Sequence, residues 1–507
     1  MRKSNFLVKK ILLLLLFNIL LCAYLFNPEN IGLANAGSIV YNDIRSINPA
    51  TLANHKGFTI QIIGANIGVG NNFLSISNYN DINGANFDDP TASKYFPKSD
   101  LLSLFNNGIN FNSQFDFSLP FSSIAYNNIS FSSRTYSSIN ATLPQSLMDL
   151  TLYGNILNKR YELDINSSIN IFSEYAFGYS VKNKFISTGF RIKYLQGISS
   201  IELDNLSDNS TYFYTDSLGF LGKSEYLINQ FIGGSGLALD LGILSNKSIN
   251  GWSFGLSLSN LFAQIKWDDN NFTYNYLKNS IIDQLPLRYN EKQYFAINLD
   301  TLTAISMMNM PMNEIYSIQN FPVIELTDID EIDFITTIVN EFGDSLLVSE
   351  YGELIVTEYD SYLLESTNMP DTLLSSLNLA SNSYKTLYPI YFNFGAQKKI
   401  EKNITICFDL STGFNDVLKN SKRWKLSTGL LFNRFKNTPI TLGLSFGGAD
   451  KINSGFSIGY KKGPILISYA LGTRGGIFVP SLKGIDFTFS LIFKTNFSKK
   501  HTSYSNK

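Results

Sequence analysis

Apolar and polar residues alternate along most of the C-terminal third of the chain. In the segment 485–493, every second residue is large and apolar, while Asp486, Thr488 and Ser490 lie between them. A period of two predicts a β-strand with one apolar and one polar face. The same pattern recurs in six further segments: 388–394, 404–410, 424–432, 440–446, 456–460 and 465–471.

The first half of the chain shows the same alternation in a weaker form. We expect strands there at 58–64, 109–117, 121–131, 169–181, 186–194, 237–243 and 252–258. The length of each segment is close to the roughly ten residues that a tilted strand needs to cross a bilayer. Single-chain bacterial barrels have an even number of strands, and these segments total about fourteen. The predicted fold is therefore all-β, a transmembrane antiparallel β-barrel of about 14 strands.

The connections between these segments alternate in length. Membrane barrels have short periplasmic turns and longer extracellular loops, so this alternation supports the barrel. The short connections are expected at 118–120, 182–185, 244–251, 397–403, 433–439 and 461–464. The longer ones, expected to be extracellular, are 65–108, 132–168, 195–236, 259–387, 411–423, 447–455 and 472–484.

The N-terminus resembles a secretory signal. Four basic residues (Arg2, Lys3, Lys9 and Lys10) precede an apolar stretch at 11–26, and Ala34-Asn35-Ala36 matches a small-x-small cleavage site. An uncleaved anchor is the alternative, but the apolar stretch is shorter than the ~20 residues of a spanning helix. We expect a cleaved signal peptide at 1–36, a plug segment at 37–56, the barrel at 57–497 and a polar periplasmic tail at 498–507.

Composition narrows the class of protein. Aromatic residues make up 14% of the chain and charged residues only 16%, with a net charge of −1. Barrels place aromatic residues on the lipid face and at both interfaces, so outer-membrane lipid is the expected environment. The lack of basic excess argues against nucleic acid as a partner. A soluble all-β periplasmic or secreted protein is the alternative reading of the same strands.

One long connection is strongly acidic. From Gln293 to Tyr384 there are fifteen acidic residues and no Lys or Arg. We expect this stretch inside a large extracellular insert at 262–387, with a hairpin at 344–358, and it is the surface where a protein partner would bind. One acidic group has two interpretations, a Ca²⁺ site or a solvated acidic loop; it consists of Asp328, Asp330, Glu331 and Asp333. No metal site is predicted, because the spacing lacks the glycine and terminal glutamate of an EF-hand.

The sequence lacks the pattern of a catalytic site. Two stretches match G-x-S-x-G, around Ser253 and Ser457, but both lie inside alternating segments rather than at a strand-to-helix turn. The only histidines are His55 and His501. We therefore predict no enzyme activity, no catalytic residue and no cofactor.

Three places carry a resemblance to a known family. They are Asn48-Pro49-Ala50, the paired segments 236–242 and 252–261, and the segment 465–471 with the closing strand after it. Together these resemble the FadL-like long-chain fatty-acid transporters and the related PorV-like barrels of type IX secretion, most closely uncharacterised members. The resemblance implies a barrel with an inward-folded N-terminal segment, near which hydrophobic substrates bind before leaving sideways. Asn48, Pro49 and Ala50 are the candidate gate residues; an ordinary turn before the first strand is the alternative.

Two functions follow from this resemblance. The first is passive transport of small hydrophobic compounds across the outer membrane of a Gram-negative bacterium. The second is a non-transporting, PorV-like barrel that docks secretion or surface partners, which the acidic insert and the short plug favour. A transporter should have an apolar pocket near Asn48–Ala50 and a break in the hydrogen bonding of the wall. A docking protein should have a closed wall.

Overall fold

The computed structural model describes residues 27–495 with internal gaps. The gaps are at 45, 119–120, 122, 206–210, 216–219, 402, 416–421 and 436, and between 269 and 383 only 273–275, 291–299, 323–325, 335–339, 345–349 and 354–356 are described. The predicted signal peptide core and the tail at 498–507 lie outside the described residues. No helix in the described parts is long and apolar enough to cross a membrane.

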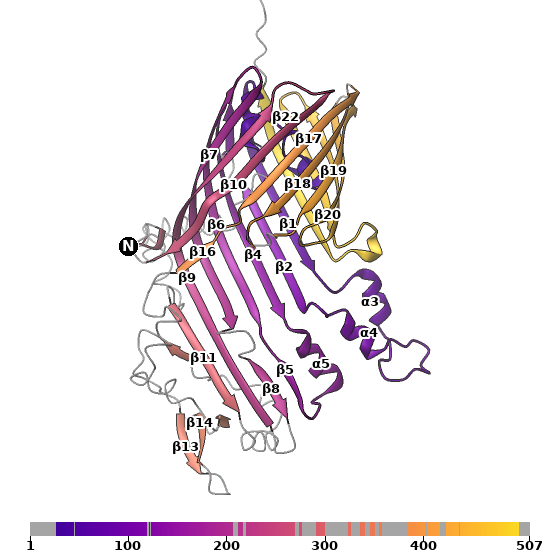
Figure 1. The fold of residues 1–507 in the computed structure, drawn as a ribbon, viewed down its shortest axis with the longest axis vertical. Helices are drawn as coiled ribbons and strands as arrows, with labels where there is room; N and C mark the ends of the chain where they lie inside the picture. The colour runs from indigo at the N-terminus through magenta and orange to yellow at the C-terminus, as the bar shows by residue number, and fades with distance from the viewer. Residues whose placement is uncertain are drawn as a thin grey trace, which may run out of the picture.

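Fourteen antiparallel strands form a closed barrel, as predicted (Figure 1). The barrel closes where the first strand pairs with the last, from Phe58↔Thr495 to Gly70↔Gly484. In order round the wall, the strands are β1 (Phe58–Asn71), β2 (Ile109–Ser118), β4 (Ile129–Leu143), β6 (Asn166–Lys182), β7 (Ile186–Asn205), β9 (Phe220–Ser245), β10 (Trp252–Trp267), β17 (Tyr391–Glu401), β18 (Ile404–Gly413), β19 (Lys425–Phe435), β20 (Thr438–Gly447), β21 (Ile452–Lys462), β22 (Ile465–Arg474) and β23 (Gly484–Thr495).

The two faces of the wall differ in polarity. On β22, Tyr469 and Leu471 are each 47% exposed, whereas the hydroxyl-bearing Ser468 between the apolar positions is fully buried. Large apolar side chains are exposed in the same way on the other strands, including Leu442 on β20. An apolar exterior around a polar interior is the arrangement of a barrel in a bilayer. The alternation in the sequence thus correctly predicts a transmembrane barrel.

Several strands continue beyond the barrel at the end with the long connections, here called the outer end (Figure 1). Three short helices lie there, and α4 and α5 pack through an apolar cluster around Leu101, Phe105 and Ile109. The additional elements are α3 (Ile76–Ile82), α4 (Lys98–Ser103), α5 (Gln145–Tyr153), β5 (Lys159–Glu162), β8 (Tyr212–Thr215), β11 (Glu291–Leu299), β12 (Val323–Glu325), β16 (Tyr384–Leu387) and η4 (Val479–Ser481).

Two details of the predicted topology are wrong. The segment 121–131 is not one strand, because β3 (Ser123–Tyr126) prolongs the line of β2 and the turn follows at Asn127 and Asn128. The outer connection at 448–451 is also shorter than the inner turn at 246–251, so the alternation of lengths is not universal. Strand pairing continues past the bilayer on β7 and β9, which shortens the outer loops that the apolar pattern predicts.

The acidic insert is described only in part. The predicted hairpin at 344–358 is confirmed, since β14 (Ser345–Ser349) pairs with β15 (Leu354–Val356), and β13 (Ile335–Val339) pairs with β14 on its other side. The acidic group at 328–333 lies outside the described residues. Within the described parts of the chain, no three His, Cys, Asp or Glu residues gather in a way that could hold a metal ion.

The apolar exterior makes a prediction for β20. Replacing Leu442 by arginine places a charge on the lipid face near the middle of a strand. We expect Leu442→Arg to lower the free energy of unfolding by about 2–4 kcal/mol, the cost of arginine at the bilayer midplane. Urea unfolding in lipid vesicles measures this change, with Leu442→Ile as the apolar control. Equal stability of the two variants would place Leu442 outside the lipid.

Candidate functional site: the plug and the lumen

Residues 27–56, here called the plug, cross the inside of the barrel. The plug begins with α2 (Pro28–Gly32), which packs on β20, β21 and β22, and ends with η1 (Pro49–Asn54), which packs on β6, β7 and β9. Irregular backbone is tolerated at membrane depth only where protein or water surrounds it. The plug therefore rests on opposite sides of the wall and closes the inner part of the barrel.

Asn48, Pro49 and Ala50 start η1 and are all buried. Asn48 is extended (φ −81°, ψ 114°), as the following proline requires, and its side-chain oxygen accepts a 2.9 Å hydrogen bond from the Ala50 amide. The side-chain nitrogen donates at 3.0 Å to the carbonyl oxygens of Ile243 on β9 and Leu256 on β10. One amide thus caps η1 and binds it to two wall strands.

A line of glycines in the wall gives the plug its close fit. A Cβ atom on Gly189 would lie 2.5 Å from the Pro49 carbonyl carbon, and one on Gly443 would lie 2.1 Å from that of Leu33. Several of these glycines are register partners on adjacent strands, as in Gly189↔Gly242 and Gly429↔Gly443. We call these residues the glycine row: Gly189, Gly242, Gly255, Gly395, Gly429, Gly443 and Gly455. A side chain at these positions would clash with the plug, with its backbone at Gly189, Gly443 and Gly455 and mainly with its side chains at the others.

Polar contacts fasten the middle of the plug. The carboxylate of Asp409 on β18 accepts hydrogen bonds from the Ser38 amide at 2.8 Å and the Ser38 hydroxyl at 2.9 Å. Lys494 on β23 forms an ion pair with the buried Asp43 at 2.9 Å. These contacts satisfy polar groups of irregular backbone that the plug takes out of water.

A network of buried ion pairs lines one side of the lumen. Arg134 on β4 pairs with Glu174 on β6, and Lys193 on β7 lies 3.4 Å from that carboxylate. Lys193 also contacts Asp240 on β9 at 2.9 Å, and Arg191 contacts the same carboxylate at 3.2 Å. All five side chains are at most 11% exposed. The sequence analysis did not predict this network. The signal in the sequence is that Arg191 and Lys193 lie between the lipid-facing aromatic residues of β7.

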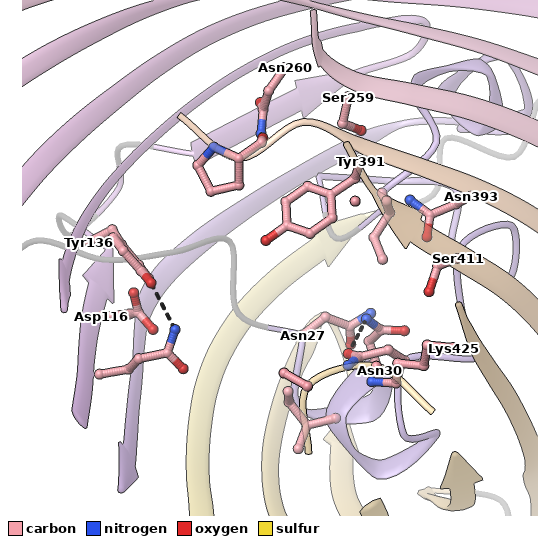
Figure 2. Close-up of a pocket in the computed structure, with 18 of the residues that line it drawn as sticks. Asn27, Asn30, Asp116, Tyr136, Ser259, Asn260, Tyr391, Asn393, Ser411 and Lys425 are labelled. Carbon is pink, nitrogen blue, oxygen red and sulfur yellow. Dashed lines mark hydrogen bonds between the residues drawn. The ribbon is translucent and has the colours of Figure 1, made fainter. Parts of the chain in front are cut away.

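The lumen contains a polar cavity of about 400 Å³ beside the plug. Figure 2 shows Asp116 and Tyr136 on one side of it, with Asn393, Ser411 and Lys425 on the other. Gly447 at the end of β20 and residues 448–450 of the outer connection after it also line the cavity, so it lies on the outer side of the plug. Both signs of charge line this cavity, and the plug contributes Ser46 and Ile47 to it. The apolar pocket expected near Asn48–Ala50 stays a prediction.

The hydrogen-bonded wall is interrupted between β2 and β3. Seven steps along the chain separate Phe117 from Ile124, but only four separate their partners on β4, Thr135 and Phe131. The chain from β2 to β3 therefore has three more residues between these two pairs than β4 has, and we call this mismatch the break. Pro120 belongs to this stretch and has no N–H to give to the ladder.

The strand on the other side of the interruption is irregular as well. This strand is β1, whose register against β23 shifts at Ile62. Phe121, in the chain between β2 and β3, has a left-handed backbone (φ 61°), and 59% of its surface is exposed. Beside this point, the plug residues Ile44 and Leu52 pack on Ala125 of β3. The wall thus has a local break next to an apolar part of the plug. This break is the feature that a transporter was expected to have.

The two G-x-S-x-G serines lie inside strands, as predicted. Ser253 is in β10 and Ser457 is in β21, where its hydroxyl is hydrogen-bonded to Thr441. The Nε2 atom of the His55 ring lies 3.4 Å from the Thr59 hydroxyl. Neither serine is at a sharp strand-to-helix turn, which a nucleophile elbow needs.

Comparison with known proteins gives one family match and several structural likenesses. Residues 49–217 match a family described as "Family of unknown function (DUF5723)". No curated protein matches the sequence.

Several solved structures resemble this chain at low sequence identity. The Pseudomonas putida toluene transporter TodX is 11% identical, with 89% of this chain and 94% of that chain covered and a TM-score of 0.43. The Ralstonia pickettii toluene transporter TbuX is 9% identical, with 93% and 98% covered and a TM-score of 0.43. A Pseudomonas aeruginosa FadL homologue is 10% identical, with 92% and 98% covered and a TM-score of 0.42. At such identities and scores, nothing about substrate is carried over, and the likeness to PorV-type barrels stays a prediction.

The Asn48 side chain makes a prediction about plug attachment. Asn48→Ala removes two hydrogen bonds to the wall and the cap of η1, at a cost of about 1–3 kcal/mol for buried groups left unsatisfied. We expect faster hydrogen exchange of the backbone amides of η1, measured by mass spectrometry. Asn42→Ala is the control, because Asn42 bonds only to Asn54 within the plug. Unchanged exchange in η1 after Asn48→Ala would contradict the assigned role.

Proposed function

We propose that this protein is a passive transporter of small hydrophobic compounds in the outer membrane of a Gram-negative bacterium. The observation that carries this proposal is the break in the ladder between Phe117 and Ile124. A continuous ladder leaves no route from the lumen into the bilayer, whereas a break provides one. The plug blocks the straight path through the inner part of the barrel, so a solute that enters from outside leaves sideways.

The cavity and the break are neighbours. Asp116 and Arg134 line the cavity. Asp116 is two positions before Ser118, the last paired residue of β2, and Arg134 is next to Thr135, the last residue of β4 that pairs with β2. A solute in the cavity therefore reaches the break without passing the plug. At the break it meets Ile44 and Leu52, which are apolar.

The polarity of this route narrows the class of compound. Paired charges line the cavity, and a purely apolar molecule gains little by replacing water there. The break is bordered by apolar plug residues and opens toward lipid. We infer that the transported compounds are amphipathic, with a polar or charged end for the cavity and an apolar part that enters the bilayer.

Closing the break tests this function. Deleting residues 119–121, which include Pro120, removes the three-residue mismatch. The design lets β2 and β3 pair with β4 as one strand. We expect cells producing the wild-type protein to take up radiolabelled decanoate faster than cells without it. We expect the deletion to abolish that gain, because the side exit is sealed.

The controls separate transport from folding. The deletion variant should keep the heat-dependent gel shift of a folded barrel, and the lipid-face variant Leu442→Ile should take up decanoate like wild type. Decanoate uptake that persists in the folded deletion variant would exclude the break as the exit. A wild-type protein that gives no gain in uptake would overturn the transport function itself.

A further inference from the structure

The first ten described residues are built into the lumen. Leu33 is fully buried, Ala34 is 5% exposed and Ala36 is 1% exposed. Leu33 and Ala36 pack with Tyr41 and Cys407 in one apolar cluster, which joins this segment to the rest of the plug and to β18. These residues have the burial of a protein core.

The wall beneath this segment is shaped to receive it. The part of the glycine row on β19, β20 and β21 consists of Gly429, Gly443 and Gly455, which are register partners. Cβ atoms there would lie 2.7 Å from a Leu33 methyl, 2.1 Å from the Leu33 carbonyl carbon and 2.0 Å from the Ile31 carbonyl oxygen. Glycine weakens a strand interior, so glycine in the middle of a strand often marks a site where another backbone approaches closely.

Polar groups of the wall are directed at the same segment. Glu29 is only 2% exposed, and its Oε1 accepts a 2.9 Å hydrogen bond from the Ser468 hydroxyl on β22. The Thr441 hydroxyl on β20 donates to the Glu29 carbonyl oxygen at 3.1 Å. Burying a carboxylate is costly unless it is hydrogen-bonded, so Ser468 complements the Glu29 side chain, while Thr441 satisfies its backbone carbonyl.

Cleavage after Ala36 would remove all of these contacts. It would leave Gly429, Gly443 and Gly455 facing an open lumen and would take away the first third of the plug. We propose that residues 27–36 are retained in the mature protein as the first third of the plug, and that any leader removed on export ends before Asn27. This inference holds for a transporter and for a docking barrel alike.

The mature N-terminus tests the proposal directly. The full-length chain is produced in a Gram-negative host, purified from its outer membrane and analysed by N-terminal sequencing and intact mass. We expect a first residue at or before Asn27. A mature protein that starts at Gly37 would overturn the proposal.

A pair of glycine variants gives a second, independent measurement. Gly443→Ala places a methyl group against Leu33, whereas the control Gly189→Ala places one against Pro49, which either cleavage site retains. We expect both variants to lower the urea midpoint of unfolding, each by roughly 1 M, because overpacking against backbone is destabilising. A Gly443→Ala variant as stable as wild type, beside a destabilised Gly189→Ala, would show that residues 31–34 are absent from the mature lumen.

Discussion

The pairing of β1 with β23 is the constraint on which the rest of this structure depends. No water reaches the hydrocarbon interior of a bilayer, so an open sheet edge there would leave a row of unsatisfied N–H and C=O groups. The ladder from Phe58↔Thr495 to Gly70↔Gly484 removes both edges at once. Only a closed wall can then enclose a polar interior, and only a polar interior can hold the irregular plug and its ion pairs.

The wall was predictable from sequence because lipid imposes a simple rule. Every second residue of a spanning strand must be apolar, which placed β17 to β23 and most of the earlier strands correctly. The rule fails where lipid is absent. On β7 and β9 the strands continue outside the bilayer, so the alternation no longer marks their ends. The expected turn at 118–120 is also absent as such, because β3 follows β2 along the same line of strand and the turn comes at Asn127 and Asn128.

The lumen was less predictable because its pattern is three-dimensional. Arg191 and Asp240 are far apart in sequence, and only the register of β7 against β9 brings them together. The glycine row is likewise scattered over seven strands and has no local signature. Ala34-Asn35-Ala36 shows the opposite problem: small residues suit a peptidase, but they also suit a chain that must pass close to a wall, and sequence alone does not distinguish these uses.

The plug also has a mechanical consequence. Because α2 is fixed to β20–β22 and η1 to β6, β7 and β9, the segment between them spans the barrel as a cross-brace. A barrel wall without such a brace can flatten, since neighbouring strands can hinge about the line of their hydrogen bonds while those bonds persist. Here the two ends of the plug are held on opposite walls at once. Any displacement of the plug must therefore change its contacts with both walls.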